Sequence, residues 1–238
     1  MTAIVIPVKP PLQGKQRLRP VFSGKQRAAL VLAMLQDVLE TATVTARQED
    51  HCVWVVTADP MVQAVATKWG AGIIHEQSVN GYNAAVSTGL AALGSRYPRG
   101  INVAVIPGDI PCVTVADLTA LAAQTTAETG TVRLAPSHDK RGTNGLFLSS
   151  ATLLKPAFGP DSFNRYRQIV SHREIKLEII ESPTLSLDID YPSSLMAFAE
   201  QGARSHTGVF LDNLPAGADL ADFYASTDAN EFRSHAAQ

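Results

Sequence analysis

The sequence predicts a three-layer α/β protein, with helices on both faces of a mostly parallel, Rossmann-like sheet. Short β-branched runs alternate with longer amphipathic segments through most of the 238 residues, as in chains of strand–helix units. The run Cys52–Thr57 is apolar at almost every position, which is typical of a parallel strand buried on both faces. Both observations favour parallel strands joined by crossover helices.

Strands are expected where apolar or β-branched residues form short runs. In chain order the expected strands are 4–8, 52–57, 73–75, 103–106, 132–135, 146–148 and 175–180. Helices are expected where apolar residues recur on one face or where a capping signal follows a strand, as Asp59 and Pro60 do. The expected helices are 24–45, 60–69, 82–93, 115–127, 162–172 and 192–200, the last opening at Asp190-Tyr191-Pro192.

The chain length suits one large α/β domain or a domain with an appendage. We expect a domain over 1–202 and a C-terminal extension over 203–238, because the chain becomes more polar and less periodic there. Pro215, Gly217 and the stretch 219–224 indicate a loop and one short helix. Three fates stay open for this extension: packing on the body, packing on a second copy in a homodimer, or disorder.

Composition excludes several classes of function. Hydrophobic residues make up 45% of the chain, and the net charge of −2 argues against a general nucleic-acid or anionic-membrane binder. Cys52 and Cys112 are too few and too far apart for a metal motif or a disulfide framework, so we expect buried, reduced thiols. No basic region precedes the first apolar run, and no apolar run approaches the ~20 residues of a membrane span. We therefore expect a cytoplasmic protein.

The first candidate site is the basic loop after strand 4–8, because ligands of such sheets bind beyond the carboxyl ends of the strands. It holds one glycine and a cluster of four cations, Lys9, Lys15, Arg17 and Arg19. Cations and exposed backbone N–H groups suit a polyphosphate. A solvated basic loop is the alternative, and the spacing fits neither the Walker loop nor the dinucleotide fingerprint.

The second candidate site consists of carboxylates at strand ends. Asp109 lies in the tight run Pro107-Gly108-Asp109-Ile110-Pro111, directly after strand 103–106. Asp188 and Asp190 lie two residues apart in an extended segment and so face one side. Carboxylates placed in this way suit Mg²⁺, which takes one or two of them with phosphate oxygens and water. Capping of a turn remains an alternative for Asp109, and the start of the next helix one for Asp190.

Three polar segments complete the candidate cleft. Asn80–Ala85 opens a helix with small residues, so its N-terminus can receive an anion or a ribose. The loops 137–145 and 158–163 offer hydroxyls, cations and helix-start N–H groups for a second anionic substrate.

Together these motifs resemble the sugar-nucleotide and molybdopterin-type nucleotidyltransferases. The narrower resemblance, over roughly residues 4–198, is to the 2-phospho-L-lactate guanylyltransferase family of coenzyme F(420) biosynthesis. The motifs that carry it are Ile6-Pro7-Val8-Lys9, Lys15-x-Arg17-Leu18, Thr57-Ala58-Asp59, Gly142-Thr143-Asn144, Phe158-Gly159-Pro160-x-Ser162-Phe163 and Leu187-Asp188-Ile189-Asp190. The resemblance implies a fold of the nucleotide-diphospho-sugar transferase type.

The resemblance also implies a reaction, in which GTP and a phosphorylated three-carbon acid give a guanylyl diphosphate-linked product and pyrophosphate. The acid is 2-phospho-L-lactate, phosphoenolpyruvate or 3-phospho-D-glycerate, and departures near residues 138–141 and at Asp161 leave its identity open. An acceptor phosphate is already an ionised nucleophile, so the reaction needs charge neutralisation and alignment more than a strong base.

Site residues carried over from the resemblance fall into four groups. They are Lys15, Arg17 and Asp109 for catalysis; Lys15, Arg17, Gly81 and Asn83 for GTP; Thr143, Gly159 and Ser162 for the acid; and Asp109 with Asp188 or Asp190 for Mg²⁺. Two alternatives stay open. One is a molybdenum-cofactor-type nucleotidyltransferase, and the other is a non-catalytic nucleotide-binding protein on the same fold.

Overall fold

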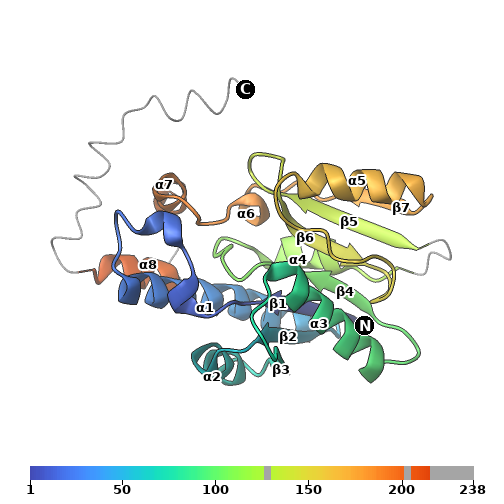
Figure 1. Cartoon of the computed structure of the whole chain (residues 1–238), viewed down its shortest axis with the longest axis horizontal. Helices are drawn as coiled ribbons and strands as arrows, with labels where there is room; N and C mark the ends of the chain where they lie inside the picture. Colours follow the sequence, from blue (N-terminus) through green and yellow to red (C-terminus); the bar gives the residue numbers. More distant parts are fainter. Residues whose placement is uncertain (126–129, 201–204, 215–238) are drawn as a thin grey trace.

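A computed structural model describes residues 1–125, 130–200 and 205–214 of the chain. It contains one seven-stranded sheet with the order β3-β2-β1-β4-β6-β5-β7 (Figure 1). The strands are β1 (Thr2–Pro7), β2 (Cys52–Thr57), β3 (Gly72–His75), β4 (Asn102–Val105), β5 (Thr131–Pro136), β6 (Thr143–Leu148) and β7 (Lys176–Ile179). Each expected strand is present, with its ends shifted by a few residues at most.

The strand directions confirm a mostly parallel sheet, with one exception. β1 runs parallel to β2 and β4, β2 to β3, and β5 to β7. β6 is antiparallel to both of its neighbours, β4 and β5. The sequence pattern did not predict this reversal. As a consequence, Thr143 at the start of β6 lies at the edge of the sheet where β4 and β5 end.

Helices cover both faces of the sheet (Figure 1). They are α1 (Gly24–Gln48), α2 (Pro60–Lys68), α3 (Tyr82–Arg96), α4 (Val115–Ala122), α5 (Ser162–His172), α6 (Pro183–Ser186), α7 (Pro192–Glu200) and α8 (His206–Asp212), with 3-10 turns η1 (Pro11–Gln13) and η2 (Gln16–Leu18). The alternation of side chains along β1 shows how the layers form. Ile4 and Ile6 pack with α1, α2 and α4, whereas Ala3 and Val5 pack with α3 and α5.

The longest helix, α1, begins with a capping box in which Ser23 and Gln26 bond to each other's backbone N–H. α1 is also long and apolar enough to cross a membrane, since the mean hydropathy of its most apolar 18-residue stretch is 1.4. The expectation that no apolar run approaches that length is therefore wrong for this segment. Because 67% of that stretch is buried inside the molecule, its apolar character is explained by packing in the core.

Three further differences from expectation concern helices. α4 ends at Ala122 instead of continuing to 127, and residues 126–129 lie outside the described part of the chain. The short helices α6 and α8 were not predicted. The helix expected within 219–224 lies outside the described residues, and the domain boundary after residue 202 stays a prediction.

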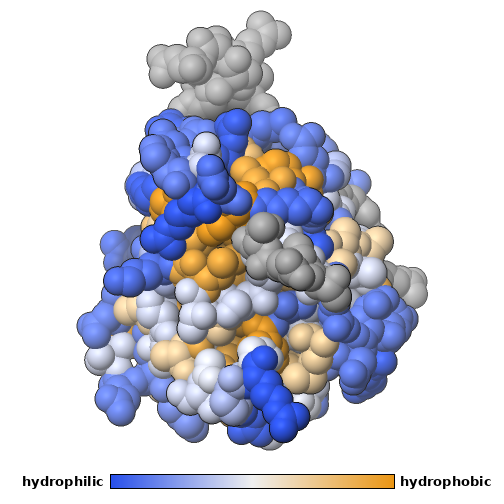
Figure 2. Space-filling model, turned by 90° about the vertical axis from the view of Figure 1, so that its right-hand side faces the viewer, coloured by the Kyte–Doolittle hydropathy of each residue, from blue (hydrophilic) through white to orange (hydrophobic). Residues whose placement is uncertain are grey.

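The surface on the side where β1 begins is mixed in character. Figure 2 shows this face, where hydrophobic residues form separate groups between larger hydrophilic areas. Such a mixture is usual for a globular protein. The ligand site is therefore expected at the carboxyl ends of the parallel strands and not on this face.

One cap expected from the sequence is present and can be tested. The Asp59 carboxylate accepts hydrogen bonds from the backbone N–H groups of Met61 and Val62, at 2.9 and 3.2 Å. We expect Asp59→Ala to lower the free energy of unfolding by about 1 kcal/mol, because two N–H groups at the start of α2 lose their acceptor. Urea unfolding followed by circular dichroism measures the change. Asp59→Ser, which keeps a side-chain acceptor, is the control and is expected to lose less.

Candidate active site

The loops that follow β1, β4 and β7 meet at one edge of the sheet. The loop after β1 supplies Lys15, the loop after β4 supplies Asp109, and the segment between α6 and α7 supplies Asp190. The last two are joined through the backbone, because the N–H of Ile189 donates to the carbonyl of Asp109 at 3.1 Å. Residues distant in sequence are thereby brought into one cluster at the carboxyl ends of the strands.

Lys15 is the centre of this cluster. Its ammonium group donates to Asp109 Oδ2 and, at 2.6 Å, to Asp190 Oδ1, while only 5% of the side chain is exposed. Burial lowers the pKa of Lys15, but the charges and hydrogen bonds of the two carboxylates outweigh it and hold the pKa above its usual value. The backbone of Lys15 is left-handed, with φ 50° and ψ 44°, which is costly for a residue with a side chain. The surrounding contacts therefore determine this conformation.

The tight turn before Asp109 places its carboxylate beside Lys15. A Cβ at Gly108 would lie 3.1 Å from Val8 Cγ2 and 3.5 Å from Leu35 Cδ1, so glycine lets the turn lie against β1 and α1. The Asp109 side chain bonds Lys15 rather than the backbone of its own turn. That contact favours a charged site over the turn-capping alternative.

Asp190 bonds two of the four cations of the basic loop. Besides Lys15, it accepts from Arg17 Nη1 at 3.4 Å, and the Arg17 guanidinium lies 4.7 Å from the centre of the Tyr191 ring. Burial raises the pKa of Asp190, but Lys15, followed by Arg17 and Lys9, outweighs it and lowers that pKa overall. The Asp190 carboxylate therefore bonds the cations of the basic loop, whereas the hydrogen bonds just ahead of α7 go to a serine. Ser194 Oγ accepts the N–H groups of residues 190 and 191.

Asp188 lies behind the other two carboxylates and is held by Asn144. Burial, then the charges of Asp109 and Asp190, raise the pKa of Asp188 to about 6. Asn144 is 7% exposed, and its amide donates to Asp188 Oδ1 at 3.3 Å and to the carbonyls of Leu185 and Ser186 at 3.3 and 2.9 Å. The sequence offered Gly142-Thr143-Asn144 as a motif, but no role was predicted for Asn144. The structure makes it the residue that orients Asp188.

The three aspartates supply the oxygen donors that Mg²⁺ prefers, and they lie close enough to repel one another. Their ligand atoms do not all lie within 4.8 Å of one another. Among the described residues, the ligand atoms of Asp37, Glu40 and His206, on α1 and α8, do lie that close together. Between Asp109 and Asp190 the Lys15 ammonium is the neutralising cation.

The expected acceptor loop lies at the start of β6 and of α5. Ser162 Oγ donates to Thr143 Oγ1 at 3.0 Å, and both residues are buried. Gly159, whose φ of 120° favours glycine, turns the chain so that its carbonyl accepts from the Ser162 N–H at 3.0 Å. The structure thus brings these three predicted residues together around the first turn of α5.

Gly81 and Asn83, expected near the guanosine, lie at the start of α3. The Asn83 amide donates to the carbonyl of Phe158 and accepts from its N–H, at 2.9 and 2.8 Å. Asn83 thus holds the 157–160 loop against α3. Its nearness to the nucleotide stays a prediction.

Tyr82 is a further residue of this cleft for which no role was predicted. Its ring packs edge-on against Phe158, which packs in the same way against Tyr166, with centroids 5.0 and 5.5 Å apart. Burial, and after it the charge of Asp109, raises the pKa of Tyr82 well above its usual value. Tyr82 is therefore part of the aromatic wall behind the acceptor loop, and it lies near enough to Asp109 for the charge of that carboxylate to act on its phenol. The sequence signal for this role is the position of Tyr82 between Gly81 and Asn83, two residues that were predicted to belong to the site.

Known proteins are similar to this chain over most of its length. The family model described as guanylyl transferase CofC like matches residues 2–226. The 3-phospho-D-glycerate guanylyltransferase of Phenylobacterium zucineum is 32% identical over 214 residues, 90% of this chain and 97% of the relative. The phosphoenolpyruvate guanylyltransferase of Conexibacter woesei is 34% identical over 218 residues, 90% and 96% of the two chains.

Solved structures share the fold. One described as a nucleotide-diphospho-sugar transferase, from Desulfovibrio desulfuricans G20, has a TM-score of 0.66 at 14% identity, covering 89% of this chain and 94% of its own. A nucleotidyl transferase from Methanothermobacter thermautotroptrophicus has a TM-score of 0.61 at 16% identity, covering 84% and 97%. The expected fold type is thereby confirmed. The chain belongs to the guanylyl transferase CofC-like family and is a nucleotidyltransferase.

Proposed function

We propose that this protein transfers GMP from GTP to a phosphorylated three-carbon acid, in the biosynthesis of coenzyme F(420). The candidate acids are phosphoenolpyruvate and 3-phospho-D-glycerate, named for the two relatives, and 2-phospho-L-lactate. The observation that carries the proposal is the buried ammonium of Lys15, in the basic loop, held by Asp109 and Asp190 at the carboxyl ends of the strands. A protonated lysine at that place suits a reaction between two polyanions.

On the nucleotide side, Lys15 and Arg17 are the groups proposed to hold the triphosphate. Lys15 stays protonated because both carboxylates stabilise its charge. Arg17 is accessible, since 61% of its side chain is exposed, and its guanidinium can exchange the long 3.4 Å contact with Asp190 for phosphate oxygens. Neutralising the triphosphate in this way favours departure of pyrophosphate.

On the acceptor side, the first turn of α5 with Thr143, Gly159 and Ser162 is proposed to receive the acid. A helix N-terminus with two hydroxyls suits a phosphate or a carboxylate. In the reaction, an oxygen of the acceptor phosphate forms a bond to the α-phosphorus of GTP. The bond from that phosphorus to the oxygen bridging to the β-phosphate breaks, and pyrophosphate leaves with its electron pair. No proton needs to be removed from an ionised phosphate, so the site requires no strong base.

Mg²⁺ belongs to the same proposal, with Asp109 and one or both of Asp188 and Asp190 as its protein ligands. The oxygen donor set fits this ion, and the mutual repulsion of the three carboxylates favours a cation near them. When bound, it would neutralise charge on the phosphates. Asn144 keeps the Asp188 carboxylate turned toward the site.

Location and assembly are also proposals. The substrates are soluble phosphorylated metabolites, which supports a cytoplasmic location. A homodimer is the proposed assembly, and sedimentation velocity of the full chain distinguishes it from a monomer.

The first test incubates the protein with Mg²⁺, one nucleoside triphosphate and one phospho-acid at a time, and identifies products by mass. We expect a guanylyl diphosphate-linked acid and pyrophosphate from GTP with at least one of the three acids. Turnover with CTP or ATP in preference to GTP would contradict the guanylyl assignment and favour the molybdenum-cofactor-type alternative. Nucleotide binding without pyrophosphate release from any acid would favour the non-catalytic alternative.

The second test removes the central cation. Lys15→Met should lower kcat/KM by roughly 10²–10³-fold, because a preorganised positive charge at the phosphates is lost. Lys25→Met is the matched control, since Lys25 is exposed at the start of α1, and it should retain normal activity. Initial rates of pyrophosphate release measure both variants. Equal activities of the two variants would show that Lys15 has no role in the reaction.

The third test concerns the metal. Asp109→Asn should raise the Mg²⁺ concentration needed for half-maximal rate, because one anionic ligand becomes neutral, and should slow turnover roughly a hundredfold. Mn²⁺ binding, followed by electron paramagnetic resonance, gives a readout independent of turnover. Asp50→Asn, at an exposed position after α1, is the control. Unchanged Mn²⁺ affinity in Asp109→Asn would remove this residue from the metal site.

A further inference from the structure

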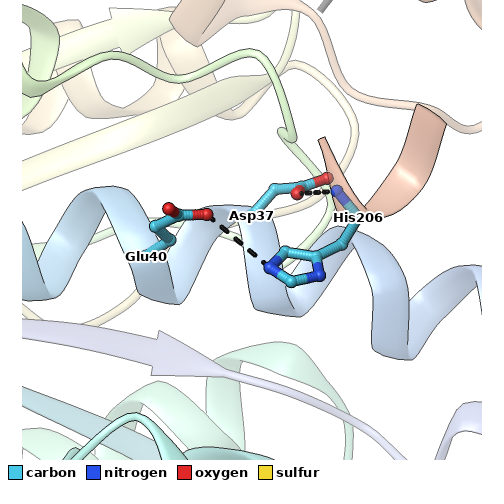
Figure 3. A group of neighbouring side chains, drawn as sticks. All are labelled: Asp37, Glu40 and His206. Carbon is cyan, nitrogen blue, oxygen red and sulfur yellow. Dashed lines mark hydrogen bonds and ion pairs between the residues drawn. The ribbon is translucent and has the colours of Figure 1, made fainter. Parts of the chain in front are cut away.

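The last helix of the described residues, α8, is attached to α1 by a buried carboxylate. Asp37 is 5% exposed, and its two oxygens accept the backbone N–H groups of His206 at 2.6 Å and Thr207 at 3.0 Å (Figure 3). Ser205 Oγ accepts a third N–H of the same turn, from Gly208. The first turn of α8 is therefore capped in part by a residue of another helix, far away in sequence.

The side chains around Asp37 have the composition of a metal site, but their contacts indicate helix attachment. Both Asp37 oxygens already accept backbone hydrogen bonds. Glu40 pairs with His206 Nε2 at 3.6 Å (Figure 3). The His206 ring also packs edge-on against Trp69, with ring centroids 5.8 Å apart. Asp37, Glu40 and His206 thus each have a partner within the protein, and these contacts join α8 to α1.

The apolar side of α8 reaches the basic loop. The Phe210 ring packs edge-on against the Phe22 ring, with centroids 6.1 Å apart, and Leu211 and Leu214 join the same core. A hollow of about 660 Å³ remains between α1 and α8. Among the described residues, the Phe210–Phe22 pair and the two hydrogen bonds to Asp37 are the most specific contacts that hold α8 in place.

Phe22 in turn fixes the conformation of the basic loop. Its N–H donates to the carbonyl of Leu18 at 2.9 Å, and the N–H of Leu18 donates to the carbonyl of Lys15 at 3.0 Å. Arg27 Nη1 donates to the Phe22 carbonyl at 2.9 Å within the core. Leu18 and Phe22 are both buried, so they anchor the turns that directly follow Lys15 and Arg17.

We propose that α8 supports the basic loop, and that Phe210 is a positioning residue for Lys15 and Arg17 through Phe22. The inference rests on the proposed function for its kinetic consequence. It assigns the segment after residue 203 a part in the nucleotide half of the site. The acceptor loop lies beside α5, on the opposite face of the sheet from α1 and α8, so the acid should be bound independently of α8.

The kinetic test compares Phe210→Ala with Val209→Ala, its neighbour on the same helix, which is 59% exposed. Phe210→Ala should raise the KM for GTP about three- to tenfold, while the KM for the acid and kcat change little, as for a lost binding interaction. Val209→Ala should match the parent chain. Equal increases in both KM values, or none in that for GTP, would overturn the proposal.

A second measurement does not depend on activity. Hydrogen exchange of the peptide spanning residues 15–22 should be faster in Phe210→Ala than in Val209→Ala, because the turn hydrogen bonds of the basic loop open more often. Asp37→Asn, which weakens the capping of α8 without touching Phe22, should produce the same change. Faster exchange confined to α8 would show that the helix stabilises the fold without supporting the loop, and would contradict the inference.

The two measurements separate this inference from the proposed function. If the parent chain transfers no guanylyl group to any acid, the proposed function fails, and hydrogen exchange alone decides whether α8 supports the loop. If the parent chain is active and exchange over residues 15–22 is unchanged in both variants, the inference fails and the function stands.

Discussion

The structure depends on one buried cation near the start of the chain, held between carboxylates from the middle and the later part of the chain. Lys15 is separated by 94 residues from Asp109 and by 175 from Asp190, and its ammonium group donates to both. Removing one member of such a cluster leaves unpaired charge in a buried place, which is strongly unfavourable. The cluster therefore holds three loops at one edge of the sheet. It also leaves a protonated amine where two polyanionic substrates are proposed to meet.

The rest of the fold keeps those loops in place. The antiparallel β6 brings Thr143 and Asn144 to the edge where β4 ends, so the acceptor loop and the aspartates lie at the same edge of the sheet. Asn83 and the aromatic stack from Tyr82 to Tyr166 hold the acceptor loop from one face of the sheet. α1, and α8 attached to it, contact the basic loop from the other face.

Much of this could be predicted from the sequence, because the relevant signals are local. The run at 52–57, the Asp59 cap and the turn at Pro107–Asp109 each specify their own conformation within a few residues. The direction of β6 could not be predicted, since an apolar run reads the same for either direction of pairing. The role of Asn144 and the attachment of α8 through Asp37 depend on partners 41 to 170 residues away. Neither contact can be recognised from the residues close to it in sequence.

The central claim is that Lys15, between Asp109 and Asp190, is the cation that receives the triphosphate. A crystal structure with a non-hydrolysable GTP analogue and Mn²⁺ tests this most directly, because anomalous scattering locates the metal. We expect the Lys15 ammonium to contact phosphate oxygens, with the metal bound by Asp109 and by Asp188 or Asp190. A triphosphate bound elsewhere, with Lys15 still paired to both carboxylates and no metal beside them, would contradict the account.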